Sequence, residues 1–287
     1  MFYIGDKLYN KWLSLKNIVL YNIFKIKQGD FKVDTKKYKL VTLHDFTNMN
    51  MLEFENLYRK DQAWGNYHPG KLAEWYDHAA VKLSKDGLEL YVTNNTKTVT
   101  SYMVDGVLKD NLPPHVIKNG VGLVSSKQSY GYGLYEWNLI LPKGAALWPA
   151  AWISSADSWP PEIDVLEAYS DVKGRYQERA ETNIHCGDSK LGPNTHYMVG
   201  ADSHGRIFDH SKNLNLKLEY TEKYIKIYYN DFLCRVVTKE KHMKWFKNKK
   251  MINIMNTALR GDESKKVTFE QMSVSPMKVL DYQYYSF

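Results

Sequence analysis

The chain has 287 residues, of which 44% are hydrophobic and 25% charged, as expected for a soluble globular protein with a large core. Its net charge of +7 would suit a polyanionic partner, either nucleic acid or an acidic polysaccharide, or would simply keep the surface soluble. It contains no run of about 18 apolar residues, no zinc-finger spacing and no phosphate-binding loop. We therefore expect neither a membrane span nor nucleic-acid binding.

Residues 1–36 are predicted to be an N-terminal extension that contains an amphipathic helix. This helix either packs on its own domain or docks to a partner or a membrane surface. No signal peptide is visible, so we expect a cytoplasmic protein or one released by lysis or another non-classical route. The apolar residues that recur at helical steps are Leu8, Trp12, Leu15, Val19, Ile23 and Ile26.

Residues 37–287 are predicted to form one all-β domain, a sandwich or jelly roll. Short runs rich in aromatic and β-branched residues follow one another, and turn signals such as Lys85-Asp86-Gly87 separate them. Cys186 and Cys234 have no metal-ligand spacing and are expected to be free thiols. The predicted strand regions include 38–46, 86–94, 132–142, 216–220, 223–237 and 265–274.

The segment W-P-P-E-I-D-V-L-E, residues 159–167, carries three carboxylates with an unusual spacing. Glu162 and Asp164 share one face of a strand, whereas Glu167 at an odd offset should point the other way. A β-bulge near Val165-Leu166 would add one residue and return Glu167 to the face of the other two acids. We therefore predict a bulged strand with three carboxylates on one face.

Three acids on one face suit retaining glycoside hydrolysis, in which one carboxylate attacks the sugar and another protonates the leaving oxygen. Close carboxyls also push their pKa values apart, so that one stays ionised while the other holds a proton. Two other interpretations of residues 162–167 remain open. They are a solvated acidic edge strand and a calcium site.

Several segments resemble glycoside hydrolase family 16 in its β-bulge form. EIDVLE is similar to the E-[ILV]-D-x-x-E signature of that family, and residues 130–154, 181–187 and 216–237 resemble further blocks in the family's order. The resemblance covers roughly residues 37–287. The family includes laminarinases, agarases, porphyranases and carrageenases, so the resemblance implies a concanavalin A-like jelly roll of two antiparallel sheets.

Carried over by position, the resemblance implies a role for each acid. Glu162 would be the nucleophile, Glu167 the acid/base and Asp164 the residue that tunes them. His185, on the adjoining strand, would be the active-site histidine that helps position or tune the acid/base. The candidates for substrate binding are Trp148, Trp159, Trp64, Arg175 and Arg179.

The resulting function is an endo-acting retaining hydrolase of a polysaccharide, either a β-glucan or a marine galactan that carries sulfate or not, acting on extracellular glycans. No cofactor and no catalytic metal are expected, and a structural Ca²⁺ is compatible with the resemblance alone. The net charge of +7 favours an anionic galactan slightly. The alternative is a non-catalytic carbohydrate-binding or adhesion protein, or a virion-associated component, on the same fold.

Overall fold

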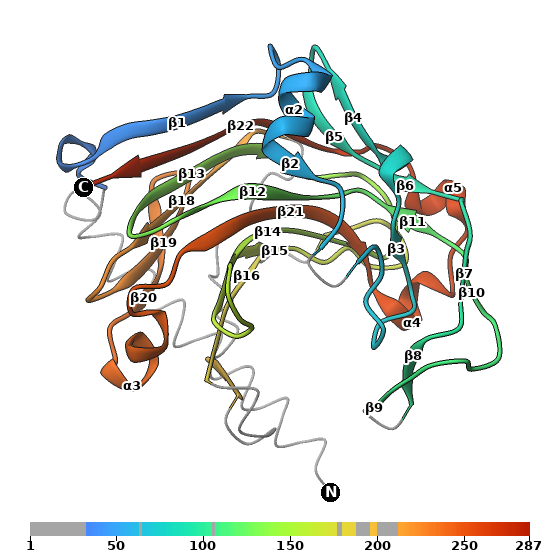
Figure 1. Cartoon of the computed structure of the whole chain (residues 1–287). Coiled ribbons are helices and arrows are strands. Elements are labelled where there is room, and N and C mark those ends of the chain that lie inside the picture. The colour runs from blue at the N-terminus through green and yellow to red at the C-terminus, as the bar shows by residue number, and fades with distance from the viewer. Residues whose placement is uncertain (1–32, 63–64, 105–106, 177–179, 188–195, 200–211) are drawn as a thin grey trace, which may run out of the picture.

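The computed structural model describes residues 33–62, 65–104, 107–176, 180–187, 196–199 and 212–287. Two large antiparallel sheets stack face to face, and both bend around the open space below them in Figure 1. This arrangement confirms the predicted all-β jelly roll. The predicted N-terminal helix lies outside the described residues. Within them, no helix is long and apolar enough to cross a membrane.

The seven-stranded sheet lines the open space in Figure 1. The bulged strand predicted from the sequence is β15, third from one edge, so it has a partner on each side. In spatial order the strands are β17 (His196–Val199), β16 (Glu181–Gly187), β15 (Glu162–Glu167), β14 (Leu147–Ser155), β21 (Met251–Leu259), β12 (Leu123–Tyr130) and β2 (Tyr58–Arg59).

The eight-stranded sheet covers the other side of the core. Strands β19 and β20 form a hairpin whose turn residues Asn230 and Asp231 both have positive φ, as a type I′ turn requires. In order the strands are β20 (Phe232–Val237), β19 (Ile225–Tyr229), β18 (Leu214–Tyr220), β13 (Gly133–Ile140), β22 (Met277–Ser286), β5 (Gly87–Leu90) and β4 (Val81–Ser84), and β1 (Lys39–Asp45) also pairs with β22.

Three small sheets extend one end of the sandwich. They pair β7 (Lys97–Val99) with β10 (His115–Ile117), β8 (Tyr102–Val104) with β9 (Val107–Lys109), and β11 (Gly120–Val121) with both β3 (Trp75–Tyr76) and β6 (Val92–Thr93). The helical segments are short. They are η2 (Thr35–Lys37), α2 (Met51–Leu57), η3 (His78–Ala80), α3 (Glu240–Met243), η6 (Lys244–Phe246), α4 (Gly261–Ser264) and α5 (Phe269–Met272).

The strand predicted over residues 265–274 is wrong, because this segment contains helix α5. Thr268 accepts a hydrogen bond from the backbone of Gln271, and the Gln271 side chain accepts one from the backbone of Thr268. This reciprocal capping box starts a helix at Phe269 and overrides the β preference of the valine and phenylalanine nearby. The other predicted strand regions contain strands.

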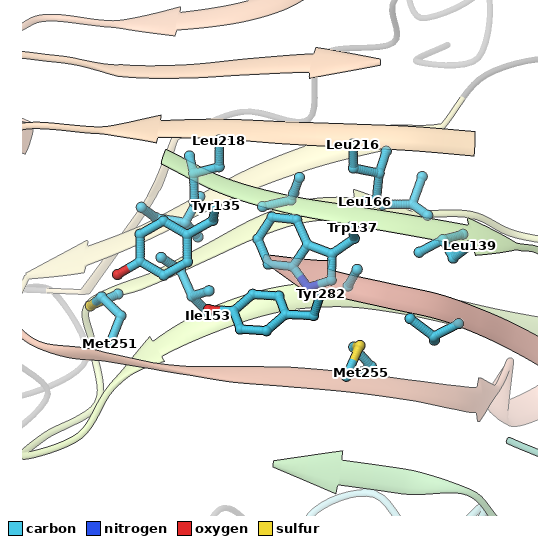
Figure 2. Close-up of a cluster of buried hydrophobic side chains, with 14 of the residues drawn as sticks. Tyr135, Trp137, Leu139, Ile153, Leu166, Leu216, Leu218, Met251, Met255 and Tyr282 are labelled. Atoms are coloured by element: carbon cyan, nitrogen blue, oxygen red, sulfur yellow. The ribbon is translucent and has the colours of Figure 1, made fainter. Parts of the chain in front are cut away.

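The core lies between the two large sheets, as Figure 2 shows. Tyr135, Trp137 and Leu139 on β13 point into it, while Glu136 and Asn138 point to the opposite face, as the alternation of side chains along a strand requires. Trp137 is wholly buried, and its indole Nε1 donates to Asn253 Oδ1 of the other sheet at 2.9 Å. Burying each large apolar side chain contributes about 1.5–3 kcal/mol, so this layer holds the two sheets in register.

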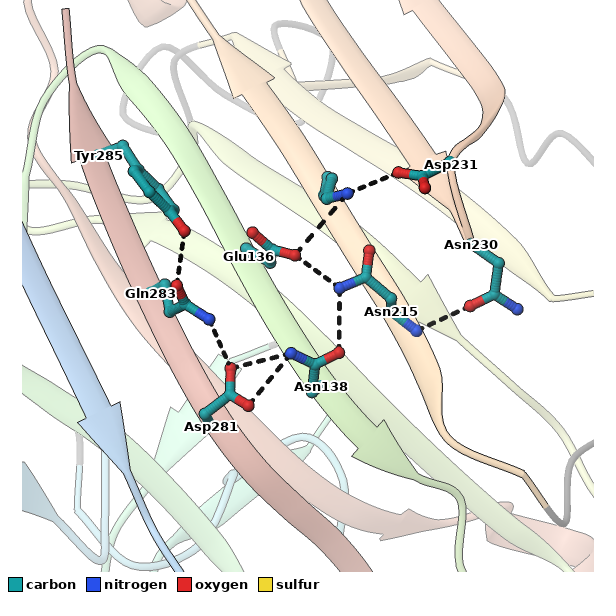
Figure 3. Close-up of polar contacts among 9 residues, drawn as sticks. Glu136, Asn138, Asn215, Asn230, Asp231, Asp281, Gln283 and Tyr285 are labelled. Carbon is teal, nitrogen blue, oxygen red and sulfur yellow. Dashed lines mark hydrogen bonds and ion pairs between the residues drawn. The ribbon is translucent and has the colours of Figure 1, made fainter. Parts of the chain in front are cut away.

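The outer face of the eight-stranded sheet carries a polar network, shown in Figure 3. Asn138 Nδ2 donates to both carboxylate oxygens of Asp281, at 3.0 and 3.1 Å, and Gln283 Nε2 donates to Asp281 Oδ1. Glu136 accepts a hydrogen bond from Asn215 Nδ2 at 2.7 Å. Several of these side chains bind one another across neighbouring strands, so they stabilise the pairing of the strands on the solvated face of the sheet.

Candidate active site

A cleft of about 670 Å³ lies on the exposed face of the seven-stranded sheet. Strands β14, β15, β16 and β21 supply its floor, and residues 68–76 supply part of its wall. Six residues that were predicted to belong to the site line this cleft. They are Trp148, Trp159, Glu162, Asp164, Glu167 and His185.

The predicted β-bulge is present in β15. On the β14 side, Asp164 pairs with Trp152 and Leu166 with Ala151, so Val165 has no partner in the ladder. On the β16 side, the register also shifts between Asp164 and Glu167. The extra residue returns Glu167 to the face of Glu162 and Asp164, and all three carboxylates line the cleft.

Strand β16 places a second row of polar residues opposite the acids. His185 pairs with Glu162, Asn183 with Asp164 and Glu181 with Glu167. His185 Nε2 lies 3.6 Å from Glu162 Oε1 and 3.2 Å from Asp164 Oδ2, so it contacts both carboxyls. His185 therefore lies on the strand that adjoins β15, as predicted.

Glu162 and Glu167 each accept a hydrogen bond from a tryptophan. Trp159 Nε1 donates to Glu162 Oε2 at 3.0 Å, and Trp148 Nε1 donates to Glu167 Oε1 at 2.9 Å. Asn183 Nδ2 donates to the other oxygen of Glu167. These donors fix the orientation of both carboxyls without supplying a full positive charge.

The carboxyls shift each other's pKa values. Burial and then the neighbouring charge of Asp164 raise the pKa of Glu162 to about 8. Burial and then the charge of Glu167 raise the pKa of Asp164 well above its usual range. Because removal from water and close like charges both penalise ionisation, the pair of Glu162 and Asp164 retains a proton near neutral pH.

Comparison with known sequences identifies the family. The sequence model of the glycosyl hydrolases family 16 matches residues 74–275, which include β15 and β16. The chain belongs to glycosyl hydrolases family 16. The described domain continues beyond the matched segment, since β1 starts at Lys39 and β22 ends at Ser286.

The similarity of this family 16 chain to individual proteins is low. It is 23% identical over 159 residues to endo-1,3-1,4-β-glycanase ExsH of Rhizobium meliloti, a match that covers 55% of this chain and 32% of ExsH. The chain thus spans about a third of the length of the curated relatives it matches.

Solved structures share the fold at similarly low identity. LamAcat from Zobellia galactanivorans has a TM-score of 0.62 at 17% identity, covering 86% of this chain and 98% of LamAcat. The catalytic domain of an endo-1,3-β-glucanase (laminarinase) from Thermotoga petrophila RKU-1 has a TM-score of 0.60 at 18% identity, covering 87% and 98%. These matches show that the chain shares the fold of these structures.

The structure does not bring every residue predicted for substrate binding to the family 16 cleft. Arg175 lies outside the cleft lining, because its guanidinium NH2 binds Asp171 Oδ2 at 2.6 Å on an exposed turn. Trp64 and Arg179 lie outside the described residues. Trp148 lines the cleft, and its ring is in contact with Lys71 and with Tyr169, whose ring centroid is 5.4 Å away.

Several residues of the cleft carry no signal in the sequence motif. Lys71 Nζ lies 4.7 Å from the centroid of the Trp148 ring, and burial raises the pKa of Glu74 to about 7. Both come from the segment 68–76, which is remote in sequence from β15. By contrast, Glu181 and Asn183 could have been found, since they precede His185 at steps of two on one strand.

Glu162, Asp164 and His185 together have the donor set of a cation site. One ligand atom from each lies within 4.8 Å of the other two. Two carboxylates and an imidazole can bind a transition metal such as Zn²⁺. A metal there would take up the same oxygen atoms that hold the shared proton, so metal binding and protonation of this pair exclude each other.

Proposed function

We propose that this protein is an endo-acting retaining glycoside hydrolase that cleaves internal β-glycosidic bonds of a polysaccharide. The observation that carries the proposal is the bulged strand, which aligns Glu162, Asp164 and Glu167 along one wall of the cleft. A surface strand gains nothing from such an extra residue, whereas a retaining two-carboxylate reaction needs the two groups about 5–5.5 Å apart, flanking the glycosidic bond.

In the proposed first step, Glu162 attacks the anomeric carbon and Glu167 gives its proton to the leaving oxygen. The hydrogen bonds from Trp159 and Trp148 orient the two carboxyls for these roles. In the second step, Glu167 takes a proton from water, and the hydroxide oxygen displaces Glu162 from the sugar. The two displacements return the original configuration at the anomeric carbon.

Asp164 and His185 are proposed to control the charge of Glu162. In this scheme the shared proton resides on Asp164 when Glu162 attacks, because burial and the charge of Glu167 raise the pKa of Asp164 well above its usual range. The charge of His185 lowers the pKa of Glu162 and favours the same state, since its Nε2 lies 3.6 Å from the Glu162 carboxyl. No cofactor is needed in this scheme.

The proposed substrate class is a neutral β-glucan with 1,3 or mixed 1,3-1,4 linkages. Among the described residues that line the cleft, lysine occurs once, as Lys71. A sulfated chain would lie against several carboxyl groups there, which disfavours the anionic galactan suggested by the net charge of the whole sequence. The similarity to ExsH, an endo-1,3-1,4-β-glycanase, and to the Thermotoga endo-1,3-β-glucanase supports the same choice. The acidic lining residues are Glu74, Glu162, Asp164, Glu167 and Glu181.

A polysaccharide panel tests this proposal. Laminarin, a mixed-linkage β-glucan, agarose and a carrageenan are each incubated with the protein and with Glu162→Gln, and released reducing ends are measured. We expect hydrolysis of the β-glucans by the native protein alone, with short oligosaccharides as early products. NMR of the first product should show the β-anomer. Binding without release by the native protein would favour a carbohydrate-binding function instead, and an inverted first product would contradict the two-step mechanism.

A further inference from the structure

The bulge in β15 leaves a backbone carbonyl group in the core without a hydrogen-bond partner in the sheet. On the β16 side, Val165 and Leu166 together stand opposite the single residue Thr182, because Asp164 pairs with Asn183 and Glu167 with Glu181. A bulge leaves its extra residue without a partner in the ladder. Val165 is wholly buried, so its backbone carbonyl needs another hydrogen-bond donor.

A tyrosine of the other sheet supplies that donor. Tyr229 ends strand β19 of the eight-stranded sheet, and its side chain crosses the core to β15. The Tyr229 hydroxyl lies 2.6 Å from Val165 O, to which it donates, and 3.3 Å from Glu181 O on β16. The side chain of Tyr229 is wholly buried, so no water competes for this hydrogen bond.

A second side chain of the same hairpin holds the residue opposite the bulge. Arg235 on β20 is buried, and its NH1 donates to Thr182 O at 3.2 Å. The two strands that form the bulge are thus both bound from the core side by the β19–β20 hairpin. The carboxylates of Glu162 and Glu167 project from the opposite face of the same strand.

We infer that Tyr229 is a positioning residue for the reaction, acting through the backbone of Val165 to hold the bulge that sets Glu167 relative to Glu162. This inference rests on the proposed hydrolytic function. The Tyr229 hydroxyl contacts backbone carbonyls and so acts through the main chain. Its loss would let the bulge relax or move along the strand, and a displacement of a reacting group by about 1 Å can cost about 10²-fold in rate.

The test compares Tyr229→Phe with a matched control, Tyr135→Phe. Tyr135 is also wholly buried, and its hydroxyl also binds backbone carbonyls, of Gly131 at 2.7 Å and Tyr130 at 2.9 Å, in the β12–β13 turn. Each variant loses one buried hydroxyl, so both should lower Tm similarly. We expect only Tyr229→Phe to lower kcat, by about 10- to 100-fold, with KM close to the native value. Equal kcat in the two variants would overturn the inference.

Hydrogen exchange separates this inference from the proposed function. In Tyr229→Phe, the amides of residues 164–167 should exchange faster than in the native protein, whether or not the protein hydrolyses any tested glycan. Unchanged exchange there would overturn the role of the hydroxyl. Absence of activity in the native protein, with faster exchange in the variant, would overturn only the hydrolytic proposal.

Deletion of Val165 provides a second variant in case Tyr229→Phe does not fold. The deletion removes the bulge carbonyl and leaves an even spacing between Asp164 and the next glutamate. In that background, Tyr229→Phe should fold and should leave the exchange of β15 unchanged, because the hydroxyl has no bulge to hold. If Tyr229→Phe prevents folding in both backgrounds, the role of the hydroxyl lies elsewhere and the inference fails.

Discussion

His185 Nε2 lies 3.2 Å from Asp164 Oδ2 although the two residues are not partners in the strand register. The imidazole therefore reaches diagonally from its own partner, Glu162, to the next carboxyl. Burial and the charge of Asp164 raise the pKa of Glu162 to about 8, whereas the charge of His185 lowers it. The balance of these two neighbours decides the pH at which Glu162 becomes ionised.

Asp164→Asn should move the acidic limb of the kcat/KM profile to lower pH. The substitution keeps a hydrogen-bond donor beside Glu162 and leaves this neighbour uncharged at every pH, so the Asp164 charge that raises the pKa of Glu162 can no longer form. Because Glu162 must be ionised to attack, activity should then appear at lower pH than in the native enzyme. Full pH profiles of both proteins provide the measurement, and an unmoved limb would contradict the electrostatic coupling.

His185→Gln should shift the same limb in the opposite direction. Removal of the imidazolium charge takes away an interaction that lowers the pKa of Glu162. The acidic limb should therefore move to higher pH, and activity at neutral pH should fall. If Asp164→Asn and His185→Gln move the limb in the same direction, the assignment of that limb to Glu162 is wrong.

Glu162→Gln should abolish turnover while stabilising the fold at alkaline pH. Loss of a nucleophile typically costs about 10⁴-fold or more in kcat. The pKa of Glu162 is raised by folding, so its stabilising contribution is complete below its ordinary pKa of 4.5 and is lost as pH rises through about 8. At pH 9 or so, glutamine avoids the cost of a buried charge, so the variant should have the higher Tm.

Thermal melts across pH check this stability prediction. The difference in Tm between Glu162→Gln and the native protein should grow from pH 5 to pH 9. Glu222→Gln is a suitable control, because Glu222 is 61% exposed and its carboxyl lies 3.9 Å from the exposed ammonium of Lys247. That variant should follow the native curve throughout, and parallel curves for all three proteins would contradict the burial of a charge at Glu162.

Trp148→Phe should lower kcat more than KM. The substitution keeps an aromatic ring on the cleft wall but removes the indole N–H that donates to Glu167 at 2.9 Å. Hydrogen bonds to charged groups contribute about 1.5–3 kcal/mol, so a loss of about 10- to 150-fold in kcat is expected. Trp152→Phe is the control, since Trp152 Nε1 donates to the neutral Asn256 at 2.8 Å in the same cleft.

Removal of metal ions should leave the activity unchanged, whereas added Zn²⁺ should lower it. The proposed reaction uses carboxyls and water, so activity should survive exhaustive treatment with EDTA. Added Zn²⁺ should inhibit, because Glu162, Asp164 and His185 offer ligand atoms within 4.8 Å of one another. His185→Gln should be less sensitive to Zn²⁺ than the native enzyme. Loss of activity in EDTA that Ca²⁺ or Zn²⁺ restores would instead require a metal in the mechanism.

The acidic strand was predictable because its spacing breaks a strict rule. Side chains of a strand alternate between its two faces, so the odd offset of Glu167 from Asp164 places Glu167 on the other face unless the strand contains a bulge. The structure contains the bulge at Val165. The alternation in β13 was equally readable, because Trp137 and Glu136 differ so strongly in polarity that one face must be buried.

Other parts of the site depend on contacts that no local pattern encodes. Lys71 lies in a segment more than seventy residues from Trp148 in the chain. Its ammonium lies over the Trp148 ring because the tertiary fold brings the two segments together. Arg175 was expected near sugars, but its own turn supplies a closer carboxylate in Asp171. The helix at Phe269 was within reach of sequence reasoning, since Thr268 and Gln271 have capping-box spacing.

The hydrogen bond from Tyr229 to Val165 joins residues 64 positions apart and belonging to different sheets. A segment copied from residues 162–167 into another jelly roll would therefore arrive without the donor that its extra carbonyl needs. A successful transplant would have to include a tyrosine on the facing layer, placed to reach that carbonyl. The smallest segment set that could be grafted onto another protein is therefore two strands from opposite sheets, β15 and β19.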